Sequence, residues 1–375
     1  MCADHVSHAP DYAARRGALR SLLVENGVDG LLVTDLVNIR YLTGFTGSNA
    51  ALLVHSWETR NAEDRTVIGT DGRYRTQVAE QVPDLRAEIA QATARRIVEL
   101  AGEWQLGRVG FESQVVTVDQ HRGFVEQRTG LEFVATPGLV EQLRMVKDAH
   151  EVEQLRAACA AADAGLAALL ERGALRPGRT ERQVARDLEW AVFENGAEGM
   201  SFTTIVATGA NSAVPHHRPT EAVLAAGDFV KLDFGAVVGG YHSDMTRTFV
   251  LGTPTEWQRE VYALVEESQR AGREALRPGV KVADVDAASR SVIEAAGHGK
   301  LFVHSLGHGV GLQVHEAPGI AKTGTGTLLS GVAVTVEPGV YFPGRGGVRI
   351  EDTLVVREGG PELLTHTSKD LTVVE

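Results

Sequence analysis

The chain has 375 residues, of which 43% are hydrophobic and 23% are charged, and its formal net charge is −12. These values predict a globular protein of about two domains, and the acidic balance argues against a nucleic-acid partner. No stretch reaches the roughly 18 consecutive apolar residues of a transmembrane helix, so no membrane partner is expected. The N-terminus lacks the hydrophobic run of a signal peptide, and the only cysteines are Cys2 and Cys159, so we expect a reducing, cytoplasmic location.

The first part of the chain alternates between short apolar runs and amphipathic segments. Strands are expected at 31–33, 50–54, 67–69 and 107–111, and helices at 14–26, 74–80, 95–103 and 118–128. This alternation is typical of an α/β domain with a largely parallel sheet. A long helical pattern rich in Ala and Leu then runs over 140–171. We therefore divide the chain into an N-terminal accessory domain, 1–140, and a C-terminal domain, 141–375.

The C-terminal domain contains an internal duplication. Three segments return after 101, 104 and 107 residues: LRPG at 175–178 and 276–279, GDFVKLDFG as GVAVTVEPG at 227–235 and 331–339, and SDMT as IEDT at 243–246 and 350–353. Each copy is expected to form a helix after its Arg-Pro-Gly turn and strands around its acidic motifs. A period this long predicts a duplicated supersecondary unit, and hence an α+β domain whose halves are related by a pseudo-twofold axis.

The duplication aligns acidic residues in pairs. It superposes Asp233 on Glu337 and Asp244 on Glu351, and each copy has glycines between its two acids. A single buried Asp beside a glycine turn is usually a turn or capping residue. Four carboxylates on apolar strands, however, would repel one another unless a cation compensated their charge. Two divalent cations would balance the four negative charges, so the repeat favours a dinuclear metal site.

His308 is expected to supply the single nitrogen ligand of this site. It lies with His304 and His315 in a glycine-rich, otherwise apolar stretch, and His315 aligns with His216 of the first copy. A set of carboxylates with one imidazole favours Mn²⁺, with Co²⁺, Zn²⁺ and Fe²⁺ as alternatives. Two neighbouring metal ions can lower the pKa of a shared water and stabilise an oxyanion, so we expect a hydrolase.

These residues carry a resemblance to a known family. The contexts LDFG, SDMTRT, GHGVG, VEPG and RIEDT resemble those of the five-ligand set of the pita-bread metallopeptidases, here Asp233, Asp244, His308, Glu337 and Glu351. The longer runs VPHHRP, GYHSDMTRTF and HSLGHGVGLQVHEAP are most similar to the Xaa-Pro branch, which contains bacterial aminopeptidase P and prolidase. Residues 38–45 and 70–74 resemble the accessory N-terminal domain of that branch, so the resemblance covers nearly the whole chain.

The resemblance implies three catalytic residues. By analogy with the family, His216 and His315 would contact the substrate carbonyl and the tetrahedral intermediate. Glu337 would move a proton in addition to binding metal. The family also implies a homodimer and proline-containing peptides as substrates.

The resemblance also implies residues around the substrate. Arg349 would hold the metal-binding carboxylates from behind, and His304 would support the site from its second layer. Phe202 and Ile205 would wall the pocket for the prolyl ring, although Phe202 fits a plain core aromatic equally well. His217 and His242 lie close to the motifs and are interpreted as bystanders.

Within this branch, the sequence favours an Xaa-Pro aminopeptidase, which removes the first residue of a peptide when proline is second. Prolidases of the branch often carry an arginine after the His-Glu-x-Pro motif, where it reads the carboxylate of a dipeptide, and this chain has Gly319 there. The alternative is an Xaa-Pro dipeptidase (prolidase), in which another arginine, such as Arg345 or Arg218, would reach the same place. A non-catalytic binding protein on the same fold is less favoured, because such relatives lose metal ligands and all five are present.

Overall fold

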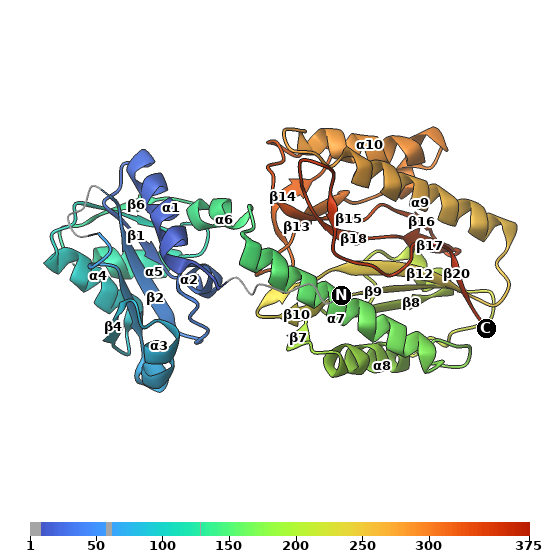
Figure 1. The fold of residues 1–375 in the computed structure, drawn as a ribbon, viewed down its shortest axis with the longest axis horizontal. Helices are drawn as coiled ribbons and strands as arrows, with labels where there is room; N and C mark the ends of the chain where they lie inside the picture. Colours follow the sequence, from blue (N-terminus) through green and yellow to red (C-terminus); the bar gives the residue numbers. More distant parts are fainter. Residues whose placement is uncertain (1–8, 58–61, 128) are drawn as a thin grey trace, which may run out of the picture. The chain divides into compact units, whose positions relative to one another are not determined.

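The structure is a computed structural model that describes residues 9–57, 62–127 and 129–375. The described chain forms two compact units, Ala9–Arg144 and Met145–Glu375 (Figure 1). Cys2 lies outside the described residues, and Cys159 is a buried free thiol. Among the described residues, no helix combines the length and the apolar character that crossing a bilayer requires.

The N-terminal unit is built around one six-stranded sheet of order β4-β3-β2-β1-β5-β6. Its strands are β1 (Gly30–Val33), β2 (Ala50–His55), β3 (Val67–Thr70), β4 (Arg86–Ile89), β5 (Arg108–Phe111) and β6 (Glu132–Ala135). Its helices are α1 (Tyr12–Glu25), α2 (Leu36–Thr43), α3 (Arg75–Gln81) preceded by the 3₁₀ turn η1 (Gly72–Tyr74), α4 (Thr93–Glu103), α5 (Val118–Val125) and α6 (Leu139–Arg144). The predicted α/β class is confirmed.

The sheet differs from the prediction in direction and in extent. It is mixed, because β2 runs antiparallel to both β1 and β3, whereas the other pairs are parallel. No helix separates β2 from β3 in the described chain, so the chain reverses there as in a hairpin. The edge strands β4 and β6 were not predicted. Both are largely exposed and carry charged residues, which hides a strand pattern.

The predicted helix 140–171 is wrong as one element. The structure has α6 and then a separate helix α7 (Ala149–Glu171). Asp148 begins α7 through a capping box, in which its side chain accepts from Glu151 N over 2.9 Å and the Glu151 carboxylate accepts from Asp148 N over 3.0 Å. This local capping interrupts a sequence pattern that is otherwise continuous.

The C-terminal unit places its strands between two pairs of helices. α9 (Glu256–Ala275) and α10 (Val282–Ala295) lie on one side, and α7 and α8 (Glu181–Glu194) lie on the other (Figure 1). Strands β8, β9 and β12 of the first half form a sheet with the C-terminal strand β20, in the order β20-β12-β9-β8, and the second half forms the sheet β14-β13-β15-β18-β19. The strands are β7 (Gly199–Met200), β8 (Ile205–Thr208), β9 (Phe229–Phe234), β10 (Ala236–Val238), β11 (Tyr241–His242), β12 (Met245–Leu251), β13 (Gly307–Gly309), β14 (Glu316–Ile320), β15 (Ala333–Val336), β16 (Gly339–Phe342), β17 (Gly346–Arg349), β18 (Asp352–Val355), β19 (Glu362–Leu363) and β20 (Thr372–Val374).

The two halves repeat the same local geometry. Gly178 N donates to Leu224 O over 2.9 Å, and the equivalent Gly279 N donates to Leu328 O over 2.8 Å. The two glycines have φ values of 85° and 83°, in the region that a residue with a Cβ rarely adopts. Each half then places its acids on an antiparallel pair, β9 with β12 and β15 with β18. The predicted α+β domain with an internal repeat is confirmed.

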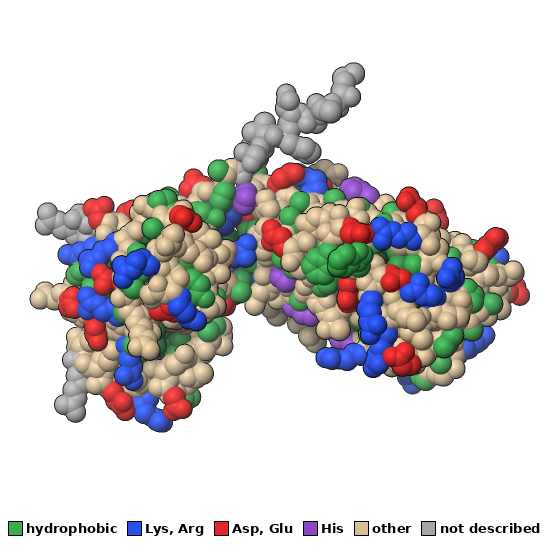
Figure 2. Space-filling view, turned by 90° about the horizontal axis from the view of Figure 1, so that it is seen from below, with side chains coloured by type: hydrophobic (Ala, Val, Ile, Leu, Met, Phe, Trp, Pro, Cys, Tyr) green, Lys and Arg blue, Asp and Glu red, His purple; other side chains and the backbone are tan. Residues whose placement is uncertain are grey.

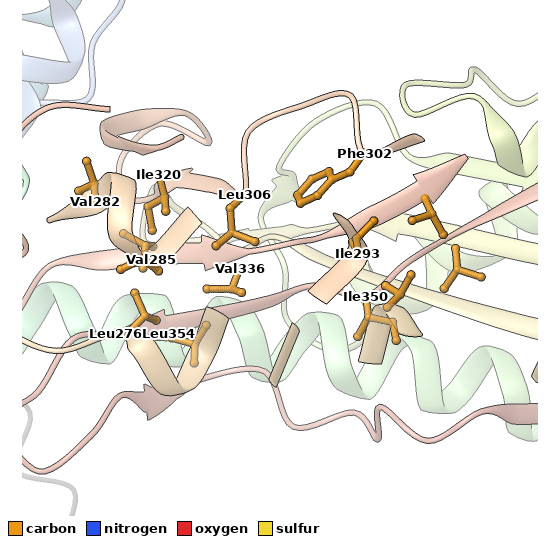
Figure 3. Close-up of a cluster of buried hydrophobic side chains, with 14 of the residues drawn as sticks. Leu276, Val282, Val285, Ile293, Phe302, Leu306, Ile320, Val336, Ile350 and Leu354 are labelled. Carbon is orange, nitrogen blue, oxygen red and sulfur yellow. The ribbon is translucent and has the colours of Figure 1, made fainter. Parts of the chain in front are cut away.

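Each half also has its own hydrophobic core. In the second half, apolar side chains of α9 and α10 pack with strand residues such as Val336 and Leu354 (Figure 3). In the first half, side chains of α7 and α8 pack against residues of β9 and β12 such as Leu232 and Phe249. These cores hold the ends of the central strands, where the acidic residues lie, in fixed positions.

Candidate active site

All residues predicted for the site line one cavity of about 440 Å³ in the C-terminal unit. They are Phe202, Ile205, His216, Asp233, Asp244, His304, His308, His315, Glu337, Arg349 and Glu351. The cavity also contacts residues that the sequence did not single out, among them Thr203, Ser305 and Val314.

The acidic residues come from corresponding places in the two halves. Asp233 lies near the end of β9, and Asp244 directly precedes β12, its antiparallel partner. Glu337 directly follows β15, and Glu351 directly precedes β18. Because both strand pairs end at the same cavity, carboxylates more than a hundred positions apart in the sequence converge there.

The clustering of these carboxylates makes them hard to ionise together. Burial, with the charges of Asp233 and Glu337, raises the pKa of Asp244 well above its usual value. Burial, with the charges of Asp244, Glu337 and Asp233, also raises the pKa of Glu351 well above its usual value. Burial, reinforced by Asp233, raises the pKa of Glu337 to about 7. A bound cation would remove this penalty, because it stabilises the ionised form.

His308 presents a nitrogen lone pair to the carboxylates. Its Nδ1 donates to the carbonyl of Gly309 over 3.0 Å, which leaves Nε2 without a proton in the neutral ring. Nε2 lies 3.6 Å from Asp244 Oδ2 and 3.4 Å from Glu337 Oε1. Burial lowers the pKa of His308 to about 4, so the ring is neutral near pH 7, the form that binds metal.

Two further observations fit a metal centre. Asp244, His308 and Glu351 each offer a ligand atom, and the three atoms lie within 4.8 Å of one another. Asp233 Oδ1 is buried and has no hydrogen-bond partner among the described residues, although buried polar atoms normally have one. The donor set and the unpartnered oxygen both suit divalent cations.

Arg349 organises the acidic side chains from behind. It is only 2% exposed, and its Nη2 donates to Asp233 Oδ2. Its Nε donates over 3.0 Å to Thr246 Oγ1, which itself donates to Glu351 Oε2 over 2.6 Å. On the other side, Thr335 Oγ1 donates to Glu337 Oε1 over 3.2 Å. Such outer contacts fix the direction of metal-binding oxygens.

A chain of hydrogen bonds also fixes His304. Arg349 Nη1 donates to Tyr341 Oη over 2.9 Å, and the Tyr341 hydroxyl donates to His304 Nε2 over 2.8 Å. His304 Nδ1 donates to Ser305 O over 2.8 Å, which is consistent with this tautomer. Burial, with the nearby charge of Arg349, lowers the pKa of His304 to about 3. His304 is therefore a neutral, fixed ring at the cavity wall.

His216 and His315 have a different environment, because both are exposed at the cavity. The His315 ring packs edge-on against that of His308, with 4.4 Å between their centroids. Figure 2 shows histidine side chains, in purple, that reach the surface of the larger unit. Exposed imidazoles beside buried acids are accessible to a ligand that enters the cavity.

His217, interpreted from the sequence as a bystander, lies at the cavity. Its ring lines the cavity, and its Nε2 donates over 2.8 Å to Oε2 of Glu181, a fully buried residue at the start of α8. Neither Glu181 nor Tyr341 was singled out from the sequence, because each lies outside the motifs and acts through a neighbour. His242 bonds to Ser201 Oγ over 3.0 Å and is not among the residues that line the cavity.

The fold and the site together define a two-domain metallopeptidase with the pita-bread fold. The chain belongs to metallopeptidase family M24, whose model matches residues 153–358. The creatinase/prolidase N-terminal domain matches residues 15–146. The predicted membership of the Xaa-Pro group of pita-bread metallopeptidases is thereby confirmed.

Individual relatives match over nearly their full length. An Xaa-Pro dipeptidase of Pyrococcus furiosus is 34% identical over 357 residues, which cover 92% of this chain and 96% of that protein. The solved structure of an Xaa-Pro dipeptidase from Bacillus anthracis has a TM-score of 0.91 and 37% identity, with 97% of this chain and 100% of that chain covered. The solved structure of an X-Pro aminopeptidase from Thermotoga maritima has a TM-score of 0.86 and 32% identity, with 96% of this chain and 99% of that chain covered.

Proposed function

We propose that this protein is a cytoplasmic Xaa-Pro dipeptidase that hydrolyses dipeptides with proline in second place. The observation that carries the proposal is the full-length similarity to Xaa-Pro dipeptidases of Pyrococcus and Bacillus, combined with the complete set of acidic and histidine residues around one cavity. The aminopeptidase that Gly319 predicts has less support, since one of the three relatives described above carries that name and the other two are Xaa-Pro dipeptidases.

We further propose that Asp233, Asp244, His308, Glu337 and Glu351 hold two divalent cations, with Mn²⁺ as the first candidate. Four carboxylates and one imidazole suit Mn²⁺, and their charge matches two such ions. When bound, a pair of metal ions lowers the pKa of a water and polarises a carbonyl. The homodimer implied by the family stays a prediction.

The chain's own residues would then do three things. Glu337, which lies at the cavity beside the other acids, would move a proton in addition to binding metal. His216 and His315, exposed at the cavity, would donate hydrogen bonds to the substrate carbonyl as negative charge develops on its oxygen. Phe202 and Ile205 would enclose the prolyl ring. An Xaa-Pro amide has no N–H, so an apolar pocket that recognises shape suits it.

The test is hydrolysis by the Mn²⁺-loaded protein of three matched substrates, Ala-Pro, Ala-Pro-Ala and Ala-Ala. We expect Ala-Pro to be cleaved with the highest kcat/KM, and Ala-Ala to be cleaved poorly. The variant H308A serves as the control for contaminating peptidases. A higher kcat/KM for Ala-Pro-Ala would replace the dipeptidase by the aminopeptidase, and equal cleavage of Ala-Ala would remove the requirement for proline.

A further inference from the structure

We propose that Arg218 binds the C-terminal carboxylate of the dipeptide and thereby sets the preference for dipeptides. The inference rests on the proposed dipeptidase function and deepens it. A dipeptide ends directly after its prolyl ring, so a site that selects dipeptides needs a cation close to the ring pocket. By the resemblance described above, the position at which prolidases of this branch often carry an arginine is Gly319 in this chain, and a Cβ built there would meet nothing within 4 Å. The cation must therefore come from another element.

The cavity lining contains two arginines, and only one of them is free to bind a ligand. Arg349 is buried, and its guanidinium already donates to Asp233, Thr246 and Tyr341. Arg218 is exposed, lines the same cavity, and has no ion pair or side-chain hydrogen bond with any described residue. A guanidinium can bind a carboxylate with two parallel hydrogen bonds, and Arg218 has all its donors available for this.

The backbone that carries Arg218 is held on its N-terminal side by two buried side chains. Lys231, which is fully buried, donates from Nζ to Val214 O over 2.7 Å and to Pro215 O over 3.2 Å. Arg349 Nη1 also donates to Pro215 O, over 3.1 Å. These three bonds fix the turn immediately before His216, so the loop enters the cavity wall at a defined place.

Glu181 holds the same loop on both sides of Arg218. Its Oε2 accepts from His217 Nε2 over 2.8 Å and from Thr220 N over 2.9 Å. Pro219, directly after Arg218, further restricts the backbone of Arg218. The loop is thus rigid although its side chains are exposed. A cation on a preorganised backbone loses less conformational entropy on binding than one on a mobile loop.

The position of Arg218 in the chain suits the leaving side of the substrate. It lies two residues after His216, which the proposed mechanism places at the scissile carbonyl, and next to His217 of the cavity wall. A single rigid segment would therefore contact the carbonyl of residue one and the carboxylate of the proline. A tripeptide has no carboxylate at that place, so it would lose the ion pair.

The experiment compares Ala-Pro with its amide, Ala-Pro-NH₂, which has the same ring but no terminal charge. Wild type should cleave Ala-Pro with the higher kcat/KM. In R218M the ratio of the two kcat/KM values should fall by about 10- to 100-fold, the range for a lost charge-assisted hydrogen bond, mainly through a higher KM for Ala-Pro. R259M removes an exposed arginine of α9 that does not line the cavity, and its ratio should equal that of wild type.

Two further measurements separate the outcomes. Bound Mn²⁺ and thermal unfolding should be the same in wild type and R218M, which shows that the site is formed. If R218M does not fold, R218Q, which is neutral but polar, decides in its place. The role of Arg218 is overturned if the ratio of kcat/KM values for Ala-Pro and Ala-Pro-NH₂ in R218M equals that of wild type. It is also overturned if wild type cleaves these two substrates equally. A wild type that cleaves Ala-Pro-Ala but not Ala-Pro overturns the dipeptidase function itself.

Discussion

Thr246 Oγ1 donates to Glu351 Oε2 over 2.6 Å, across the two halves of the internal repeat. The same hydroxyl accepts from Arg349 Nε over 3.0 Å, so its proton is committed to the carboxylate. Both side chains are buried. One small hydroxyl therefore sets the orientation of a carboxylate proposed to bind metal.

Replacing Thr246 by Val should weaken metal binding by about 10- to 100-fold, the usual effect of losing a contact that orients a metal ligand. The shape is nearly unchanged, so the effect comes from the lost hydrogen bond. Isothermal titration of the metal-free protein with Mn²⁺ measures it. T248V is the matched control, because Thr248 lies on the same strand and bonds only to the backbone of Arg349. An equal loss of Mn²⁺ affinity in T246V and T248V would contradict the specific role of Thr246.

Asp244→Ala should remove a metal ligand outright. We expect kcat/KM on Ala-Pro to fall by more than the roughly 100-fold upper range for supporting residues, and metal content to drop below that of wild type. The unfolding temperature of the metal-free variant should be at least as high as that of metal-free wild type, because Asp244 is buried among like charges that raise its pKa. Full metal content with full activity in this variant would exclude Asp244 as a ligand.

Metal affinity should rise with pH through about 7. In the metal-free protein, Glu337 has a pKa raised to about 7, and those of Asp244 and Glu351 are also raised, so these groups hold protons that metal must displace. Titration calorimetry at pH 6.5 in two buffers of different ionisation enthalpy should detect proton release on Mn²⁺ binding. At pH 8.5 less release is expected. Binding without proton release at pH 6.5 would contradict the raised pKa values.

His55 should make the N-terminal unit acid-sensitive. It is fully buried, neither ring nitrogen has a hydrogen-bond partner among the described residues, and burial lowers its pKa to about 4. Between pH 6.5 and 4 the unfolded chain binds a proton that the folded chain does not, so stability falls as pH falls through this window. Lowering the pKa of His55 from 6.5 to about 4 reduces the unfolding free energy by about 3 kcal/mol once the pH has fallen through this window.

The acid sensitivity can be isolated with H55L. Hydrogen exchange of β2 measures the unfolding free energy of wild type and of H55L. The difference between the two proteins should change by about 3 kcal/mol between pH 7 and pH 4. Comparing the two proteins cancels the other titrating groups, including Glu112, whose pKa burial raises to about 7. A difference that does not vary with pH would show that the folded chain protonates His55 as readily as the unfolded chain does.

Gly235→Ala should disturb the site through the backbone. A Cβ at Gly235 would lie 1.8 Å from the carbonyl oxygen of Ser243, so the segments that carry Asp233 and Asp244 must separate. We expect a loss of about 1–3 kcal/mol in stability, as for overpacking, together with lower metal content. G359A is the control, since a Cβ there meets nothing within 4 Å. Wild-type metal content in G235A would show that the segments tolerate the change.

The sequence by itself determined the class of the fold and most of the residues around the cavity. The acids and histidines lie in short runs that repeat at nearly constant spacing, and the strands around them are largely apolar segments such as residues 332–336. Each of these signals is local. Periodicity and turn chemistry act within a few residues and can be recognised without knowing what packs against them.

Tertiary structure alone decided which side chains are free and which are already bonded. Arg349 and Arg218 both stand in motifs, yet Arg349 is buried and bonded to its neighbours whereas Arg218 is exposed at the cavity. The ring of His217 is held at the cavity wall by a hydrogen bond to Glu181, which is 36 positions away in the sequence. The direction of β2 depended in the same way on its neighbours in the sheet. Such contacts depend on how distant segments pack, and no local pattern specifies that packing.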